Sequence, residues 1–146
     1  MTIARAQIVA LAKDWLGTPY HHRASVKQAG CDCIGLIAGV WRELYGTEPQ
    51  SPGAYTGDWA EATGNEALLA AAHKHLVPVA QADAQPGDIL IFRLRANSVA
   101  KHAAILVSAT HMIHAQEGVP VSQVAFGPWW RRRVAGIFAL PGVEGS

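Results

Sequence analysis

The 146-residue sequence lacks several features that would assign a protein class at once. Its two cysteines cannot form the disulfide framework of a small secreted domain. A net charge of +1 argues against bulk nucleic-acid binding, which needs a strongly basic surface. No run of about 18 apolar residues is present, so no segment is predicted to span a membrane.

The N-terminal segment MTIARAQIVALAKDWLG also lacks the features of a signal peptide. It has no uninterrupted apolar stretch and no small-residue cleavage site, so we expect a protein that is cytoplasmic at synthesis. Half of the residues are hydrophobic (50%), which is enough for a core. The length is that of one domain, and we predict a single domain over 1–146.

Apolar residues at helical spacing predict three helices in the first half of the chain. Residues 3–16 carry such residues at i, i+3, i+4 and i+7, and residues 65–76 form a shorter helix. The clearest helix begins at Cys33, because its apolar positions all lie on one face. Asp32 stands at the N-cap position of this helix, and Gly46 lies just beyond its end.

The second half of the chain carries short apolar runs that are typical of strands. A turn at 83–87 precedes all of them, and the segments 20–30 and 47–64 are predicted to be loops. The runs are 88–94, 102–107, 111–115, 119–124 and 134–140. Helices followed by strands of an antiparallel sheet indicate an α+β fold.

Cys33 stands where a thiol can gain chemical function. In the first helical turn, unpaired backbone N–H groups and the helix dipole favour a thiolate. The same N–H groups can hold an oxyanion formed when sulfur attacks a carbonyl. The Asp32 carboxylate opposes this effect. Cys31 is too close to bridge to Cys33 without strain, so Cys33 is a buried thiol, a metal ligand or a nucleophile.

Two of the seven histidines, His102 and His114, stand on predicted strands at an even separation. A three-residue loop at Ser108–Thr110 would place His114 opposite Ala104 and one diagonal step from His102, about 7–8 Å away between Cα atoms. A loop at 107–109 would place the two histidines directly opposite one another. A loop of even length would put them on different faces.

These residues allow a triad to be written. Cys33 would attack, His102 would take and return the proton, and His114 would orient the ring of His102. The plain alternative is a buried cysteine and two ordinary strand histidines. A zinc site is disfavoured, because the C-x-C spacing of Cys31 and Cys33 is shorter than the usual C-x₂₋₄-C, and we predict no metal.

Four motifs in order resemble the NlpC-type cell-wall cysteine peptidases, a papain-like family. They are D-C-I-G-L at 32–36, P-G-D-I-L-I-F at 86–92, H-A-A-I at 102–105 and M-I-H-A at 112–115. The longer form G-C-D-C-I-G-L-I-A-G-V-W, together with P-W-W-R-R-R, is most similar to the branch encoded by phages and gene transfer agents.

The resemblance implies a papain-like fold, with N-terminal helices packed on a five- or six-stranded antiparallel sheet. It also implies hydrolysis of an amide in peptidoglycan stem peptides, usually the D-γ-glutamyl–diaminopimelate bond, without a cofactor. By motif position Cys33 is the nucleophile, His102 the base and His114 the third polar residue. Tyr20, in L-G-T-P-Y, and Asp32 correspond to residues that bind substrate or stabilise the oxyanion.

The chain also departs from the family pattern. Here 11 residues, His21–Cys31, separate Tyr20 from the D-C motif, where the family has a short glycine-rich link. Ile34 follows the nucleophile, where serine is common. Without a signal peptide or a wall-binding domain, we expect a protein of a phage-like tail that acts in the cell wall or periplasm, with tail proteins as partners.

Other functions remain open on the sequence. A non-catalytic tail-tip protein would keep the fold and dock through Trp129–Arg133, since Trp and Arg are enriched at binding hot spots. In the plainer interpretation of that segment, one tryptophan packs and the arginines are solvated. A related thiol amidase or acyltransferase would keep the thiol chemistry and change the reaction.

Overall fold

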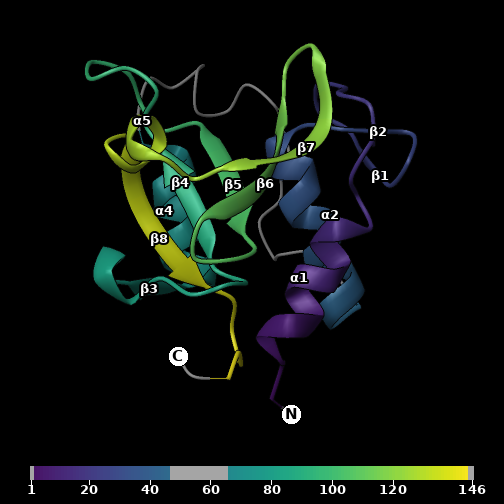
Figure 1. Ribbon diagram of the computed structural model, residues 1–146, viewed down its shortest axis with the longest axis horizontal. Helices are drawn as coiled ribbons and strands as arrows, with labels where there is room; N and C mark the ends of the chain where they lie inside the picture. The colour runs from purple at the N-terminus through teal and green to yellow at the C-terminus, as the bar shows by residue number, and fades with distance from the viewer. Residues whose placement is uncertain (1, 47–65, 145–146) are drawn as a thin grey trace.

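The computed structural model describes residues 2–46 and 66–144, so the predicted loop at 47–64 lies outside the described residues. One layer of the molecule consists of helices, and the other is a six-stranded antiparallel sheet (Figure 1). The helices of this layer are α1 (Arg5–Lys13), α2 (Cys33–Tyr45) and α4 (Ala67–His75). The predicted α+β class, with N-terminal helices on an antiparallel sheet, is confirmed.

The sheet has the strand order β3-β8-β4-β5-β6-β7. Its strands are β3 (Val77–Val79), β4 (Ile89–Phe92), β5 (His102–Leu106), β6 (His111–Gln116), β7 (Val119–Ala125) and β8 (Val134–Ala139). Five of them correspond to the predicted apolar runs. The sixth, β3, escaped prediction because V-P-V is short and contains proline, which a sheet tolerates at its edge.

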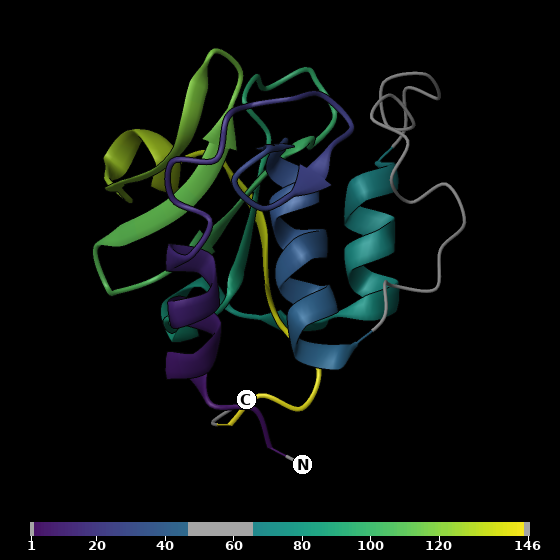
Figure 2. The same cartoon turned by 90° about the vertical axis from the view of Figure 1, so that its right-hand side faces the viewer.

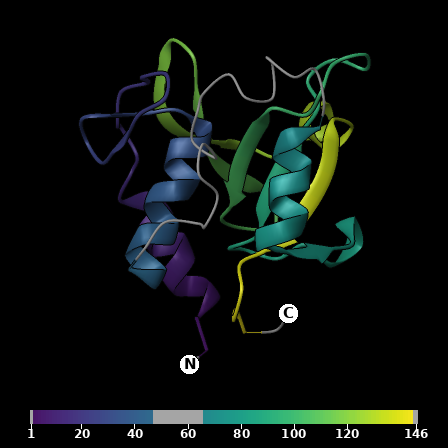
Figure 3. The same cartoon turned by 180° about the vertical axis from the view of Figure 1, so that it is seen from behind.

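The helices cover one face of the sheet, as Figure 2 shows. The core between the layers joins buried residues of α1, α2 and α4, such as Ile8, Leu36 and Leu68, to alternate strand residues such as Ile91 and Ile105. In Figure 3, α4 lies over β8, which it contacts. A smaller apolar cluster lies on the opposite face of the sheet and is formed by Leu90, Phe92, Ala104, Leu106, Met112, Phe126 and Ile137.

Helix α2 begins and ends as its sequence predicts. The Asp32 carboxylate accepts a hydrogen bond from the Gly35 N–H at 2.8 Å, which caps the first turn. Gly46 ends the helix with a φ of 76°, a left-handed value that favours glycine. Within α2, Gly39 meets the Trp15 ring so closely that an added Cβ would lie 2.0 Å from it. Because Gly39 has no side chain, α2 can pack directly against Trp15, just beyond the end of α1.

The predicted loop at 20–30 is wrong in part. Two strands of two residues each, β1 (Ser25–Val26) and β2 (Gly30–Cys31), pair there as an antiparallel hairpin. Such short strands leave no alternation in the sequence to detect. The four-residue helix α5 (Pro128–Arg131), between β7 and β8, also went unpredicted.

A buried ion pair fastens the two ends of the chain at the start of β4. The Arg5 Nη1 donates to Asp88 Oδ1 at 2.7 Å and to the carbonyl oxygen of Pro86 at 3.1 Å. The Nε of Arg5 donates to the backbone oxygen of Glu144. Asp88 also accepts the backbone N–H of Gln85 at 2.8 Å. We call this the Arg5–Asp88 pair.

The longest described helix, α2, has 13 residues. Within residues 2–46 and 66–144, no helix is long and apolar enough to cross a membrane.

Candidate active site

His102 and His114 are joined directly by a hydrogen bond between buried rings. The Nε2 of His102 lies 2.9 Å from the Nδ1 of His114. Only 8% of His102 and 3% of His114 are exposed to solvent. The bond uses Nε2 of His102, so Nδ1 is the nitrogen of that ring left for proton exchange with a substrate or a thiol.

The hairpin between β5 and β6 has the register that the three-residue loop predicts. Ile105 pairs with Ile113 and Leu106 with Met112, so His114 falls opposite Ala104. These two pairs make up the ladder, and the two histidines lie just beyond its end. The histidine rings meet there through their hydrogen bond. By strand alternation they lie on the same face as Phe92, opposite the helices.

Cys33 approaches the same strand from the helix layer. It is the first residue of α2 and is partly exposed. Its Sγ lies 3.7 Å from the carbonyl oxygen of Lys101. The Ala103 N–H also hydrogen-bonds to the sulfur. The sulfur therefore contacts the backbone on both sides of His102, at the start of β5.

The electrostatics leave both the thiol and the imidazole uncharged at neutral pH. Burial, with a further contribution from the Asp32 carboxylate, raises the pKa of Cys33 to about 12, although the backbone N–H groups of Cys33, Ile34 and Ala103 act to lower it. Burial, aided by repulsion from His114, lowers the pKa of His102 to about 3. Burial also lowers the pKa of His114. Desolvation thus outweighs the helix-terminus effect that the sequence indicates for Cys33.

Asp32 has a structural task at this position. The carboxylate is 5% exposed, and one oxygen caps α2 while the other accepts the Arg23 N–H at 2.8 Å. This second bond holds Arg23 in a left-handed conformation, with φ of 63°. These contacts give the acidic residue before Cys33 a structural role that does not depend on substrate. The role of Asp32 in substrate binding stays a prediction.

Tyr20 lies beside Cys31 despite the 11-residue link between Tyr20 and Asp32. The two residues form an isolated parallel β-bridge. The Cys31 N–H donates to the Pro19 carbonyl, and the His21 N–H donates to the Cys31 carbonyl, both at 3.0 Å. The hairpin of β1 and β2 thus returns the chain to Tyr20, two positions before Cys33. The contribution of Tyr20 to an oxyanion or substrate site stays a prediction.

Over the described parts of the chain, no three His, Cys, Asp or Glu side chains gather in a way that could hold a metal ion.

The sequence pattern of the NlpC/P60 family matches residues 17–138, which include Tyr20, Cys33, His102 and His114. The chain belongs to the NlpC/P60 family. No match was found among curated protein sequences.

Solved NlpC/P60 structures share the fold of this chain. The NlpC/p60 domain of the peptidoglycan hydrolase SagA matches with a TM-score of 0.67 and 22% identity, covering 94% of this chain and all (100%) of that one. An NlpC/P60 family protein from Bacillus cereus matches with a TM-score of 0.68 and 20% identity over 94% of this chain. The peptidoglycan hydrolase RipB from Mycobacterium tuberculosis matches with a TM-score of 0.62 and 13% identity over 92%.

The match covers the whole of the SagA domain but only part of the other two proteins. It spans 40% of the Bacillus cereus chain and 63% of the RipB chain. These relatives therefore contain a unit like this chain together with other segments.

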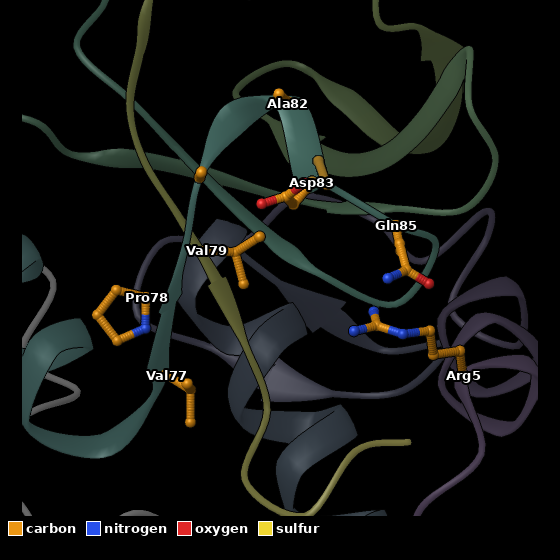
Figure 4. A pocket seen from close by; sticks show the side chains of 9 residues that line it. Arg5, Val77, Pro78, Val79, Ala82, Asp83 and Gln85 are labelled. Carbon is orange, nitrogen blue, oxygen red and sulfur yellow. The ribbon is translucent and has the colours of Figure 1, made fainter. Parts of the chain in front are cut away.

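The site does not coincide with the pocket drawn in Figure 4. That pocket has a volume of about 610 Å³ and is lined by Arg5, residues 77–80 and residues 82–85. It lies beside β3, at the lower end of the molecule in Figure 1, whereas α5 and the first residues of α2 and β5 lie at the upper end. None of the predicted site residues lines it.

Proposed function

We propose that this NlpC/P60 chain is a cysteine endopeptidase that hydrolyses an amide bond in peptidoglycan stem peptides, of the D-γ-glutamyl–diaminopimelate type. The observation that carries the proposal is the His102–His114 hydrogen bond at the point where the Cys33 sulfur contacts β5. A thiol at a helix start beside an oriented imidazole is the arrangement that thiol acyl transfer needs.

The proposed reaction proceeds through a thioester. The Cys33 sulfur attacks the carbonyl carbon while its proton passes to Nδ1 of His102. The protonated His102 then gives that proton to the departing amine as the C–N bond breaks. Water attacks the thioester, His102 takes a proton from it, and the thiol is restored.

The neutral resting states of Cys33 and His102 constrain the order of proton transfer in this reaction. The pKa directions of Cys33 and His102 indicate a thiol and a neutral imidazole, so the proton moves as sulfur attacks and no ion pair needs to exist beforehand. Nδ1 of His102 can accept a proton only when Nε2 carries the hydrogen. His102 must therefore donate to His114, and Nδ1 of His114 must accept.

The first-turn N–H groups of α2 are the proposed oxyanion donors. The backbone N–H groups of Cys33 and Ile34 face the sulfur, and an oxyanion formed on the attacked carbonyl lies next to that sulfur. Tyr20 and Asp32 are proposed to assist in holding substrate.

The test is cleavage of a synthetic stem peptide, L-alanyl-D-γ-glutamyl-diaminopimelate, followed by mass spectrometry of the products. The Cys33→Ala variant is expected to lose cleavage without losing its fold, and Cys31→Ala is the matched control that retains it. Retained cleavage in Cys33→Ala, or an inactive wild-type chain, would overturn the proposal. A product joined to an added amine would instead identify an acyltransferase.

The proposed place of action is a phage-like tail. The support is the resemblance of G-C-D-C-I-G-L-I-A-G-V-W and P-W-W-R-R-R to the phage and gene-transfer-agent branch. The chain should then be found by mass spectrometry in purified phage-like particles of its host. Its absence from such particles would contradict this placement and leave the chemistry unaffected.

A further inference from the structure

The P-W-W-R-R-R motif forms a short turn against the imidazole pair. Helix α5 carries both tryptophans between β7 and β8, close to the start of β5 in Figure 1. The two rings differ in exposure. Trp129 is 47% exposed, whereas Trp130 is partly buried and packs against the smaller apolar cluster, on the face of the sheet opposite the helices. Only Trp130 is directed at the histidines.

The Trp130 ring contacts both histidines at once. It stacks on His102 with 5.5 Å between ring centroids and 27° between planes. It meets His114 edge to face at 5.2 Å and 88°. Phe92 adds a second aromatic contact to His102, at 5.9 Å, and itself touches Trp130 at 5.0 Å.

We propose that Trp130 is a positioning residue for the reaction proposed above: its indole stacks on the His102 ring, covers the His102–His114 hydrogen bond, and keeps Nδ1 of His102 directed at Cys33. The inference rests on the proposed function, since a positioned imidazole has meaning only for a reaction that uses it.

Ring orientation is what this contact controls. The χ2 torsion of histidine is broad, so rotamer preference alone does not hold an imidazole in one plane. The hydrogen bond to His114 fixes one nitrogen, and stacking on Trp130 fixes the plane of the His102 ring. Covering the bond also keeps water from competing for it, which strengthens a hydrogen bond in a low-dielectric site.

The arginines of the motif hold the turn in place. The Nε of Arg131 donates to the Phe126 carbonyl at 2.8 Å, and its Nη2 donates to the Ala109 carbonyl at 3.1 Å. The Arg133 guanidinium lies 3.7 Å over the Trp129 ring and donates to the Trp129 carbonyl at 2.7 Å. Arg131 and Arg132 are nevertheless exposed, as the plain sequence interpretation expects, and the contacts of Arg131 and Arg133 fasten α5 over the sheet.

The charged and titratable groups near the pair come from every element around it. Cys33 begins α2 and Asp32 caps it, Lys101 immediately precedes His102 and β5, and α5 carries Arg131 next to Trp130. Trp130 adds no charge and acts by excluding water. Its removal should therefore change how the histidines are hydrated and leave this set of charges as it was.

The deciding experiment is an NMR pH titration of the histidines, which needs no substrate. In the wild-type chain, His102 should stay neutral well below pH 6.5. In Trp130→Ala, water reaches the ring, and the pKa of His102 should rise by at least about one unit toward the ordinary value of about 6.5. Trp130→Phe keeps a stacking ring and should titrate like the wild-type chain. Trp129→Ala is the matched control, because the Trp129 ring contacts Trp130 at 4.8 Å between centroids but neither histidine, and it should shift the titration of His102 far less than Trp130→Ala does.

Enzyme kinetics on the same variants provide a second test. Trp130→Ala should lower kcat for the stem peptide by about tenfold to a hundredfold, because a misplaced catalytic ring costs rate, while KM changes little. Trp130→Phe should restore most of the lost rate. Where Trp130→Ala does not fold, Trp130→Leu takes its place and should shift the titration in the same direction by a smaller amount.

Two results would overturn the inference. One is an unchanged His102 titration in Trp130→Ala, and the other is an equal shift in Trp129→Ala. A wild-type chain that cleaves no stem peptide would instead refute the proposed function. The titration needs no substrate, so it distinguishes failure of the proposed function from failure of the Trp130 inference.

Discussion

The Arg5–Asp88 pair and the His102–His114 pair are both buried, and they are built on opposite plans. The Arg5–Asp88 pair joins two full charges, with Asp88 completely buried (0% exposed). The His102–His114 pair joins two rings whose pKa values are both lowered by burial, so it is neutral. Both are nearly inaccessible to water, yet only one can take part in proton transfer.

The difference lies in how many bonding positions remain. In the Arg5–Asp88 pair each carboxylate oxygen accepts a hydrogen bond, and the guanidinium also donates to the Pro86 and Glu144 carbonyls. Such satisfaction is what allows two charges to be buried. The histidine bond uses one nitrogen of each ring and leaves the second. A fully satisfied pair is structural, and a neutral pair with a spare nitrogen is suited to catalysis.

The largest expected effect is on activity, from removing the His102 ring. His102→Gln keeps a polar side chain of similar reach but cannot exchange a proton, so kcat/KM for the stem peptide should fall about 10⁴-fold. Urea unfolding at pH 7 should change little. Activity within tenfold of the wild-type chain would show that His102 is not the base.

The matching change in the other pair should act on stability. Asp88→Ala leaves the Arg5 charge buried without its carboxylate, and the free energy of unfolding should fall by about 3–5 kcal/mol. The exposed Asp83→Ala is the control and should stay within about 0.5 kcal/mol of the wild-type chain. Activity per folded molecule should survive Asp88→Ala, and a selective loss of kcat would erase the contrast between the pairs.

Low pH should reduce the stability of the protein through the buried His102. An unfolded histidine binds a proton near pH 6.5, whereas burial keeps folded His102 neutral down to about pH 3. Protons therefore bind the unfolded chain preferentially, and stability present above pH 6.5 is lost as the pH falls toward 3. The slope due to His102 approaches about 1.4 kcal/mol per pH unit.

Urea titrations at several pH values measure this slope. His102→Gln should flatten it. Equal slopes in the wild-type chain and His102→Gln would mean that other groups dominate acid unfolding.

The sequence predicts where the candidate site residues lie in the fold better than it predicts their environment. Cys33 was placed at a helix start by periodicity and by the Asp32 cap, and the structure confirms that position. The loop Ser108–Thr110 sets a register that brings His102 and His114 together, and this too is observed. Both inferences depend only on local geometry, which short sequence patterns encode.

Long-range packing is what the sequence does not encode. The helix dipole favours a thiolate at Cys33, but burial by distant segments reverses the direction of its pKa. Trp130 touches His102 from a four-residue helix, 28 positions away along the chain (130 minus 102), with no periodicity to reveal it. The adjacent W-W and R-R-R were visible as a cluster, yet only the fold shows which ring faces the histidines.

The smallest expected effect comes from the second ring of the neutral pair. His114→Ala removes the acceptor for Nε2–H of His102 and leaves its ring free to turn, and a neutral hydrogen bond contributes about 1 kcal/mol, so kcat should fall by about fivefold. His114→Asn supplies an amide oxygen that can accept the same hydrogen, and it should recover part of the rate. His114→Leu fills the space without an acceptor and is the matched control. Equal rates in the Asn and Leu variants would show that His114 contributes packing and not orientation, and the neutral pair would then differ from the Arg5–Asp88 pair in charge alone.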